Sequence, residues 1–239
     1  MATVETVREK RMQDWFARYY TTKGDDRNDP LRNPGVLFQN LAFEKSVVQA
    51  LRQVEGDKRS WKILDVGCGA GFSLLRLLTY GLEPERLHGI EISESLVARG
   101  RKRFPALNLT HGDASRMDYE PDSFDLAMES TMFIQLTDES IAQAIAHEML
   151  RVVKPNGCIM LTDWRYSFGH REYRAVSASR IARLFGVGTR TSVVCRTRGA
   201  LIPPLGRALS RYFSSLYFPV CRFLPVLVGQ MTVVLRKTA

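Results

Sequence analysis

The sequence predicts an α/β fold: a doubly wound, mostly parallel sheet of seven strands, with a helical lid at the N-terminus. Short apolar runs alternate with segments of helical period, which is typical of a parallel sheet covered by helices on both faces. The 239 residues, 45% of them hydrophobic, suffice for one large core but hardly for two. In addition, one apolar run opens through three alternate glycines into a helical segment.

Two helices are expected before the first strand. The first carries four apolar residues on one face: Met12, Trp15, Phe16 and Tyr19. The second runs from about residue 36 to residue 54, after a linker rich in Gly, Asp, Asn and Pro. A helical pair of this size is too short to be a domain. We therefore expect residues 1–56 to pack on the sheet or to close over a ligand as a lid, beside a main domain at residues 57–239.

The main domain begins with five predicted strands, at residues 62–66, 87–92, 107–111, 124–128 and 158–163. The clearest helix covers residues 137–152, where Ile141, Ile145 and Met149 share one face. Residues 155–157 (Pro-Asn-Gly) cannot continue this helix and predict a turn into the fifth strand.

Substrate-side elements are expected from about residue 165. They are a helix at residues 175–185, a strand at 192–198, a helix starting near Pro204 and a final strand at 231–236. The apolar stretch from Leu216 to Leu235 contains Pro219, Arg222 and Pro225, so a membrane span is a poor interpretation of it. A buried helix and strand are expected there instead.

Positive charge is concentrated in the C-terminal third. Residues 165–239 hold 13 Lys and Arg against the single acid Glu172, in a chain of net charge +9. This imbalance favours an anionic partner, such as a phosphorylated acceptor, a lipid head group at a membrane surface or nucleic acid. A solvated arginine face is the alternative. Because the sequence shows no RNA-binding motif, we expect no nucleic acid partner.

The cysteines indicate neither a metal site nor a disulfide scaffold. Cys68, Cys158, Cys195 and Cys221 lie far apart, without C-x-x-C spacing, so no metal is expected and a reducing, cytoplasmic location fits best. Residues 1–20 mix charged with apolar positions, so no cleavable targeting segment is expected.

The sharpest motif is the loop that follows the first strand, residues 63–72, Ile-Leu-Asp-Val-Gly-Cys-Gly-Ala-Gly-Phe. Glycines let the backbone turn tightly and approach a ligand, and the following helix presents free N–H groups to it. The alternate spacing differs from the G-x-G-x-x-G fingerprint of dinucleotide sites. An acid at Asp65, two residues before Gly67, suits a ligand with an ammonium group better than a pyrophosphate.

Two further acids end neighbouring strands. Glu91 ends the second strand, where a carboxylate can accept hydrogen bonds from both ribose hydroxyls. Asp113 follows the third strand and can bind the exocyclic amine of adenine, while the Ala114 N–H can meet a ring nitrogen. Ligands of open α/β sheets bind at the carboxyl ends of the strands, so these residues indicate one nucleoside site.

Over roughly residues 61–164 these motifs resemble the class I S-adenosylmethionine-dependent methyltransferases. The resemblance implies S-adenosylmethionine as methyl donor and S-adenosylhomocysteine as product. It also implies a donor site made of Asp65, Gly67, Cys68, Gly69, Gly71, Glu91, Ile92, Asp113, Ala114 and Glu129, with Tyr20 closing from the lid. The chain departs from many relatives at Asn156, where they have a second glycine.

The C-terminal part is similar to methyltransferases associated with bacterial polysaccharide biosynthesis, through Arg171, Arg174, Phe185, residues 201–207 and residues 224–237. This resemblance implies O-methylation of a sugar or polysaccharide precursor. Another small metabolite or a lipid is the alternative acceptor, and a non-catalytic donor-binding module is the alternative to an enzyme.

A sulfonium methyl group is already activated, so the protein mainly has to align an acceptor and exclude water. A hydroxyl acceptor gains from a general base near the ends of the fourth and fifth strands. Asp163 is the first candidate, with a structural role as a strand-end acid equally open. His170, in the arginine-rich loop after Asp163, is the second candidate, as a base or a phosphate contact.

Overall fold

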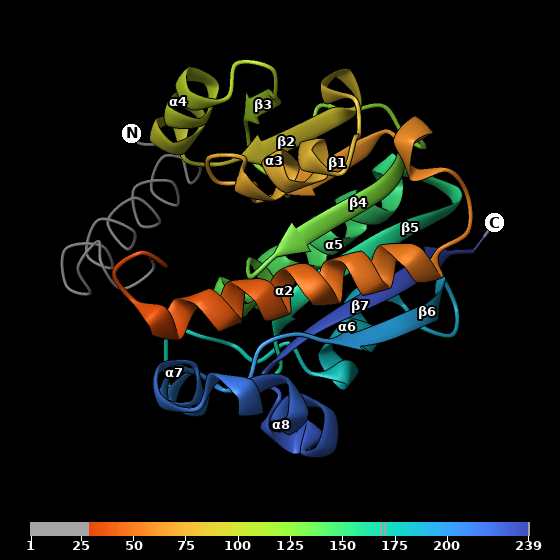
Figure 1. Ribbon diagram of the computed structural model, residues 1–239. Helices are drawn as coiled ribbons and strands as arrows, with labels where there is room; N and C mark the ends of the chain where they lie inside the picture. The colour runs from red at the N-terminus through yellow and green to blue at the C-terminus, as the bar shows by residue number, and fades with distance from the viewer. Residues whose placement is uncertain (1–28, 168, 170, 239) are drawn as a thin grey trace.

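A seven-stranded sheet forms the centre of the protein (Figure 1). The computed structural model describes residues 29–167, 169 and 171–238. The strand order is β3-β2-β1-β4-β5-β7-β6, and β1 to β5 run parallel while β7 is antiparallel to both its neighbours. The strands are β1 (Ile63–Val66), β2 (Leu87–Glu91), β3 (Asn108–His111), β4 (Phe124–Ser130), β5 (Val153–Trp164), β6 (Thr191–Arg198) and β7 (Gln230–Lys237). The predicted fold class is confirmed.

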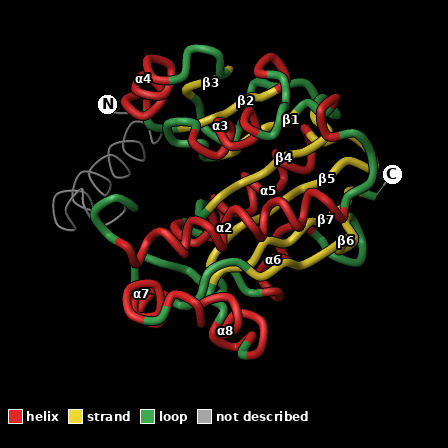
Figure 2. The backbone as a smooth tube through the Cα atoms, in the orientation of Figure 1, coloured by secondary structure: helices red, strands yellow, loops and turns green. Residues whose placement is uncertain are grey.

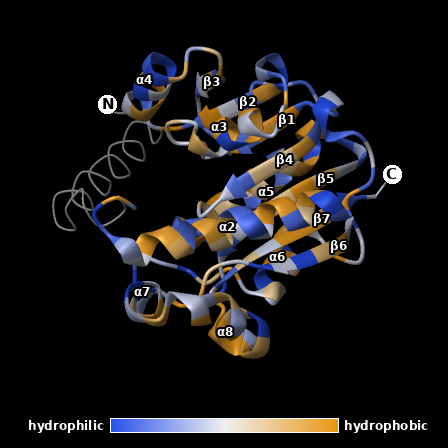
Figure 3. Ribbon diagram, viewed as in Figure 1, coloured by the Kyte–Doolittle hydropathy of each residue, from blue (hydrophilic) through white to orange (hydrophobic). Residues whose placement is uncertain are grey.

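Helices cover both faces of this sheet (Figure 2). They are α2 (Pro34–Gln53), α3 (Phe72–Thr79), α4 (Glu94–Arg103), α5 (Glu139–Val152), α6 (Ala178–Phe185), α7 (Pro203–Tyr212) and α8 (Tyr217–Phe223). Residues of α5 and α6 form one core cluster with the sheet, and residues of α2, α3 and α4 form a second cluster. The apolar colouring of the central strands β1, β2 and β5 in Figure 3 follows from this double coverage, because a parallel sheet with two covered faces needs apolar side chains on both.

The fifth strand departs from its predicted start. It begins at Val153 rather than Cys158, and residues 154–157 loop out of the pairing, since the register passes from Phe124↔Val153 to Leu126↔Cys158. Asn156 at the tip has a φ of 63°, a left-handed conformation that asparagine tolerates. The predicted turn is therefore a bulge within β5.

The apolar stretch after Leu216 is only partly buried. Its strand half, β7, lies in the sheet, but the helical half leaves Phe223 73% and Val226 67% exposed. The prediction of burial over the whole stretch is wrong because α8 packs its Tyr217 and Cys221 side inward and presents the other side to solvent. Among the described residues no helix is long and apolar enough to cross a membrane.

The segment between β6 and β7, residues 199–229, carries α7 and α8. β7 starts beside the end of β5, where Gln230 pairs with Trp164, and β6 ends there too, where Arg198 pairs with Met231. The segment therefore lies at the edge of the sheet where the parallel strands end, low in Figure 1.

The second predicted helix corresponds to α2, which packs along β6, β7 and α7. Its Ser46 hydroxyl is 2.9 Å from the Thr232 hydroxyl of β7, and the Thr197 hydroxyl of β6 donates to the Ser46 carbonyl. The first predicted helix, with Tyr19 and Tyr20, lies outside the described residues, so the lid at residues 1–56 stays a prediction.

Candidate functional site

The glycine loop leaves β1 with its backbone turned into the left-handed region three times. The φ angles of Gly67, Gly69 and Gly71 are 71°, 56° and 86°, values that side-chain-bearing residues rarely adopt. The N–H groups of Gly67 and Cys68 both donate to the Ile90 carbonyl, which ties the loop to β2. Apart from Gly69 and its two chain neighbours, no atom of the described residues lies within 4 Å of the point where a Cβ of Gly69 would stand, so this part of the chain leaves the loop open to a ligand there.

Asp65, near the end of β1, is buried. Its side chain is 1% exposed, and neither carboxylate oxygen has a partner among the described residues. Burial, with a further contribution from the charge of Glu91, raises the pKa of Asp65 to about 8. A nearby cation stabilises the charged form of such a buried carboxyl group, so an ammonium group of a ligand at the glycine loop fits Asp65.

Glu91 supports the loop from the end of β2. Its two carboxylate oxygens accept hydrogen bonds from the N–H groups of Gly69, at 3.0 Å, and Ser93, at 2.9 Å. Burial raises its pKa, and these backbone hydrogen bonds oppose the rise. A carboxylate has about four lone-pair positions, so Glu91 can still accept from ribose hydroxyls.

A pocket of about 80 Å³ lies between the ends of β2, β3 and β4. It contains the predicted Gly67, Glu91, Ile92, Asp113 and Ala114, so the structure brings these sequence-predicted residues together. The other residues that line it are Ile90, Ser130, Thr131, Met132, Gln135, Leu136 and Ile145. At its rim, one oxygen of Asp113 accepts from the Ser115 N–H at 2.8 Å.

The predicted Cys68 does not present its side chain to this pocket. The Cys68 thiol points into the core, so close to Gly89 that a Cβ on Gly89 would lie 2.6 Å from the sulfur. Burial also raises the pKa of the Cys68 thiol. Only the backbone of Cys68 can serve a ligand. His170 and Tyr20 lie outside the described residues.

Glu129, near the end of β4, is fully buried. One of its oxygens accepts from the Met132 N–H at 2.9 Å, and the other has no partner among the described residues. Burial, followed by the charge of Asp163, raises its pKa well above the ordinary value. Glu129 thus stabilises the loop that follows β4 through its hydrogen bond with the Met132 N–H.

Asp163 of β5 also stabilises the loop that follows β4. Its oxygens accept from the N–H groups of Ile134, at 2.9 Å, and Trp164, at 2.6 Å, and its side chain is 3% exposed. Burial raises the pKa of Asp163 to about 7, against these hydrogen bonds and the nearby Arg180 charge. Near neutral pH such a group can take up or release a proton.

Two residues that shape the site, Thr131 and Arg180, were not predicted from the sequence. Thr131, which lines the pocket, has a φ of 61°, a strained value for a β-branched residue, held by hydrogen bonds to Thr162 and Gln135. Arg180 of α6 is 2% exposed and donates to the carbonyls of Phe133 and Leu136 in the post-β4 loop. No motif marks either residue.

Arg180 also pairs with Glu139 at the start of α5, at 3.1 Å. Its position in the sequence, on the same side of the helix as the apolar residues Ile181 and Leu184, was the one available indication of burial. Arg180 and Asp163 together hold the post-β4 loop from two directions, which positions Thr131 and Met132 beside the glycine loop.

Residues 63–157 match a family described as methyltransferase domain. The demethylmenaquinone methyltransferase of Bacillus mycoides (strain KBAB4) is 26% identical over 190 residues, which cover 77% of this chain and 75% of that protein. The enzyme of the same name from Beutenbergia cavernae is 31% identical over 153 residues, 64% of this chain and 56% of that protein.

Among solved structures, the PH0226 protein from Pyrococcus horikoshii OT3 superposes with a TM-score of 0.62 at 14% identity. The match covers 92% of this chain and 98% of that one. This likeness concerns the fold. The match of residues 63–157 to a methyltransferase domain, together with relatives that are named methyltransferases, shows that this chain is an S-adenosylmethionine-dependent methyltransferase.

Proposed function

We propose that this methyltransferase acts on a small, lipid-soluble acceptor. The observation that carries the proposal is a cavity of about 190 Å³ between α6 and the sheet, separate from the donor pocket. Its lining is mostly aliphatic: Leu161, Val176, Ala178, Ile181, Ala182, Val187, Val193, Met231 and Val233, with the polar residues Asp163, Arg165 and Arg196. An aliphatic cavity of roughly 150 Å³ holds a benzene molecule, so this one has room for a hydrocarbon group of that size.

On the donor side, Asp65 is proposed to bind the ammonium group, Glu91 the ribose and Asp113 with Ala114 the adenine. The donor supplies an activated methyl group on a sulfonium. Four buried carboxylates, those of Asp65, Glu91, Glu129 and Asp163, lie at or near the carboxyl ends of β1, β2, β4 and β5. A ligand that carries two positive charges would favour the ionised forms of these carboxyl groups, whose pKa values burial raises.

On the acceptor side, Asp163 lines the aliphatic cavity at the strand end next to β4. The acceptor's lone pair forms the new bond to the methyl carbon while the carbon–sulfur bond breaks and its electrons return to sulfur. The acceptor proton passes to the Asp163 carboxylate, whose raised pKa suits this role near neutral pH. The aliphatic lining excludes water from the reacting atoms.

The relatives support this choice of acceptor, because demethylmenaquinone, the quinone in their name, is lipid-soluble. O-methylation of a sugar or polysaccharide precursor is the second candidate. It is favoured by a groove of about 860 Å³ with five exposed basic residues, Lys45, Arg52, Arg196, Arg198 and Arg222, which suits a sugar bearing phosphate.

The experiment that tests the acceptor class uses the purified chain with S-adenosylmethionine labelled in its methyl group. It is offered a total bacterial lipid extract in detergent and, separately, a pool of nucleotide sugars. Label recovered in the organic phase supports the proposal. Label confined to the sugars would replace it with the second candidate, and no transfer to lipid over a range of extracts would overturn it.

A substitution in the cavity gives an internal control. Ala182→Leu fills the cavity from α6 and is expected to abolish transfer to lipid while leaving S-adenosylhomocysteine affinity unchanged. Ala144→Leu adds the same volume at a half-buried position of α5 outside the cavity lining and is expected to leave both unchanged. Equal activity of the Ala182→Leu protein would show that the acceptor does not enter the cavity.

A further inference from the structure

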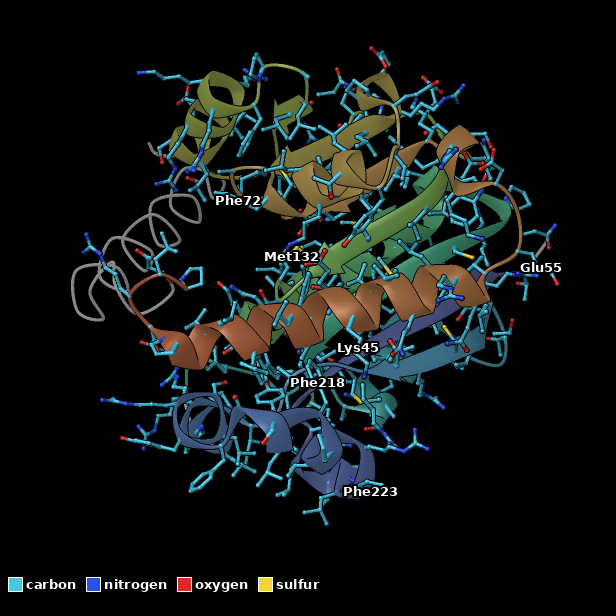
Figure 4. All side chains as sticks on the ribbon, in the orientation of Figure 1. Lys45, Glu55, Phe72, Met132, Phe218 and Phe223 are labelled. Atoms are coloured by element: carbon cyan, nitrogen blue, oxygen red, sulfur yellow. The ribbon has the colours of Figure 1, made fainter. Side chains whose placement is uncertain are left out.

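Exposed apolar side chains are concentrated on the insertion between β6 and β7. Of the ten large hydrophobic residues that are exposed in the described part of the chain, six lie between residues 212 and 226. They are Tyr212, Phe213, Leu216, Phe223, Leu224 and Val226, and we call them the apolar tip. Figure 4 shows Phe223 pointing away from the body of the protein. A patch of this kind marks an interaction surface rather than an ordinary solvated face.

Basic residues accompany the apolar tip. Arg211 and Arg222 each directly precede one of its aromatic residues and place the guanidinium over that ring, at 5.3 Å for Tyr212 and 5.9 Å for Phe223. The basic groove described above begins at Phe223 and continues past Phe218 to Lys45 on α2 (Figure 4). The sequence contains no acidic residue after Glu172, so no carboxylate of the insertion opposes an anionic partner.

These observations specify the chemistry of the partner. Aliphatic and aromatic side chains that protrude beside arginines match the boundary of an anionic bilayer, where acyl chains take up the apolar groups and phosphate groups take up the cations. A nucleic acid backbone would use the arginines but would leave Leu216, Leu224 and Val226 exposed. We propose that the apolar tip docks this protein on membranes that contain anionic phospholipids.

The position of the apolar tip relates membrane docking to the end of β5. The insertion lies at the sheet edge where β5 ends in Asp163 and Trp164. Directly after β5, the Arg165 N–H donates to the Gly229 carbonyl, and the Arg165 guanidinium and Tyr166 hydroxyl both donate to the Val226 carbonyl, at 3.1 and 3.0 Å. A docked protein would therefore hold the end of β5 near the lipid surface. This orientation rests on the proposed function, whereas docking itself does not.

The test is co-sedimentation of the purified full chain with vesicles, in the absence of donor and acceptor. The wild-type protein is expected to bind vesicles of phosphatidylglycerol and phosphatidylcholine, to bind pure phosphatidylcholine at least about tenfold more weakly, and to be released by high salt. Failure of the wild-type protein to bind the anionic vesicles would overturn the proposal.

Surface variants locate the contact. The double substitution Phe213→Ser/Phe223→Ser and the charge reversal Arg222→Glu are each expected to weaken binding at least about tenfold. The matched controls are Phe72→Ser, an exposed aromatic on α3, and Arg99→Glu, an exposed arginine on α4, and both are expected to bind as wild type. Equal binding by the tip variants would refute the assignment of the surface.

The same variants separate this proposal from two others. If they turn a dimer into a monomer while no protein binds vesicles, the tip is an interface between copies of the chain and the proposal is wrong. S-adenosylhomocysteine affinity of the tip variants is expected to equal that of wild type, which shows that they fold. Vesicle binding without transfer to lipid would retain the docking surface and reject the proposed acceptor.

Discussion

The sulfur atom of Met132 lies 2.8 Å from the point where a Cβ of Gly67 would stand. This contact joins the two loops that line the donor pocket, the glycine loop after β1 and the loop after β4. Gly67 is thus constrained twice, by its left-handed φ and by Met132, whereas Gly69 has the same kind of φ with open space above it.

That difference predicts unequal effects of adding one methyl group. Gly69→Ala is expected to lower the free energy of unfolding by about 1–2 kcal/mol, because alanine must adopt a left-handed φ there. Gly67→Ala is expected to cost about 1 kcal/mol more, because Met132 must move, and Met132→Ala should remove this excess. Urea denaturation of wild type, the three single variants and the Gly67→Ala/Met132→Ala double variant measures it. Identical losses for the two glycine variants would mean that the Met132 contact carries no energy.

Product affinity should rise with pH because of Asp65. Its pKa of about 8 means that the carboxyl is protonated below that pH and gains its negative charge above it. Binding of an ammonium group favours the charged form, so the dissociation constant of S-adenosylhomocysteine should fall by roughly tenfold between about pH 6 and pH 8.5. Calorimetry on wild type and Asp65→Asn tests this. The variant should bind more weakly and lack the pH dependence, and retention of that dependence would assign it to another group.

Glu91→Ala is expected to weaken donor binding by roughly 1–3 kcal/mol, since it removes a charged acceptor for the ribose hydroxyls. The Gly69 N–H also loses its partner, which loosens the glycine loop. Glu94→Ala, at the exposed start of α4, is the control and should bind as wild type. An unchanged dissociation constant for the Glu91 variant would place the ribose elsewhere.

Asp163→Asn should affect both turnover and stability. An asparagine has only one acceptor oxygen, so either the Ile134 or the Trp164 N–H loses its partner, at a cost of about 1–3 kcal/mol. Wild-type turnover should increase as the pH rises through about 7, where Asp163 loses its proton, and the variant should lose most turnover together with this profile while still binding S-adenosylhomocysteine. A variant with normal turnover would leave Asp163 with the structural role alone.

Arg180→Met should destabilise the protein by about 3–5 kcal/mol, because it leaves the Phe133 and Leu136 carbonyls and the Glu139 carboxylate without their buried partner. Arg183 on the same helix also reaches Glu139, at 3.5 Å, but is exposed, so Arg183→Met should cost at most about 1 kcal/mol. Urea denaturation of the two variants compares them. Similar values would show that burial of Arg180 is not what holds the loop.

The sequence by itself determined the strands, the glycine loop and the acids at the strand ends. These features depend on local physics: side-chain periodicity marks buried strands, and only glycine readily adopts three left-handed φ values in five residues. Asp65, Glu91 and Asp113 could be assigned because each directly follows or ends an apolar run, and parallel strands bring such ends to one edge.

Tertiary structure alone decided which polar groups have partners and which apolar groups are covered. Arg180 meets the post-β4 loop from more than forty residues away, and Asp65, enclosed between β2 and β4, has no side-chain hydrogen-bond partner among the described residues. The exposure of Phe223 likewise depends on which side of α8 packs against α2 and α7. Composition and spacing do not encode these outcomes, since burial is settled by contacts between residues far apart in the chain.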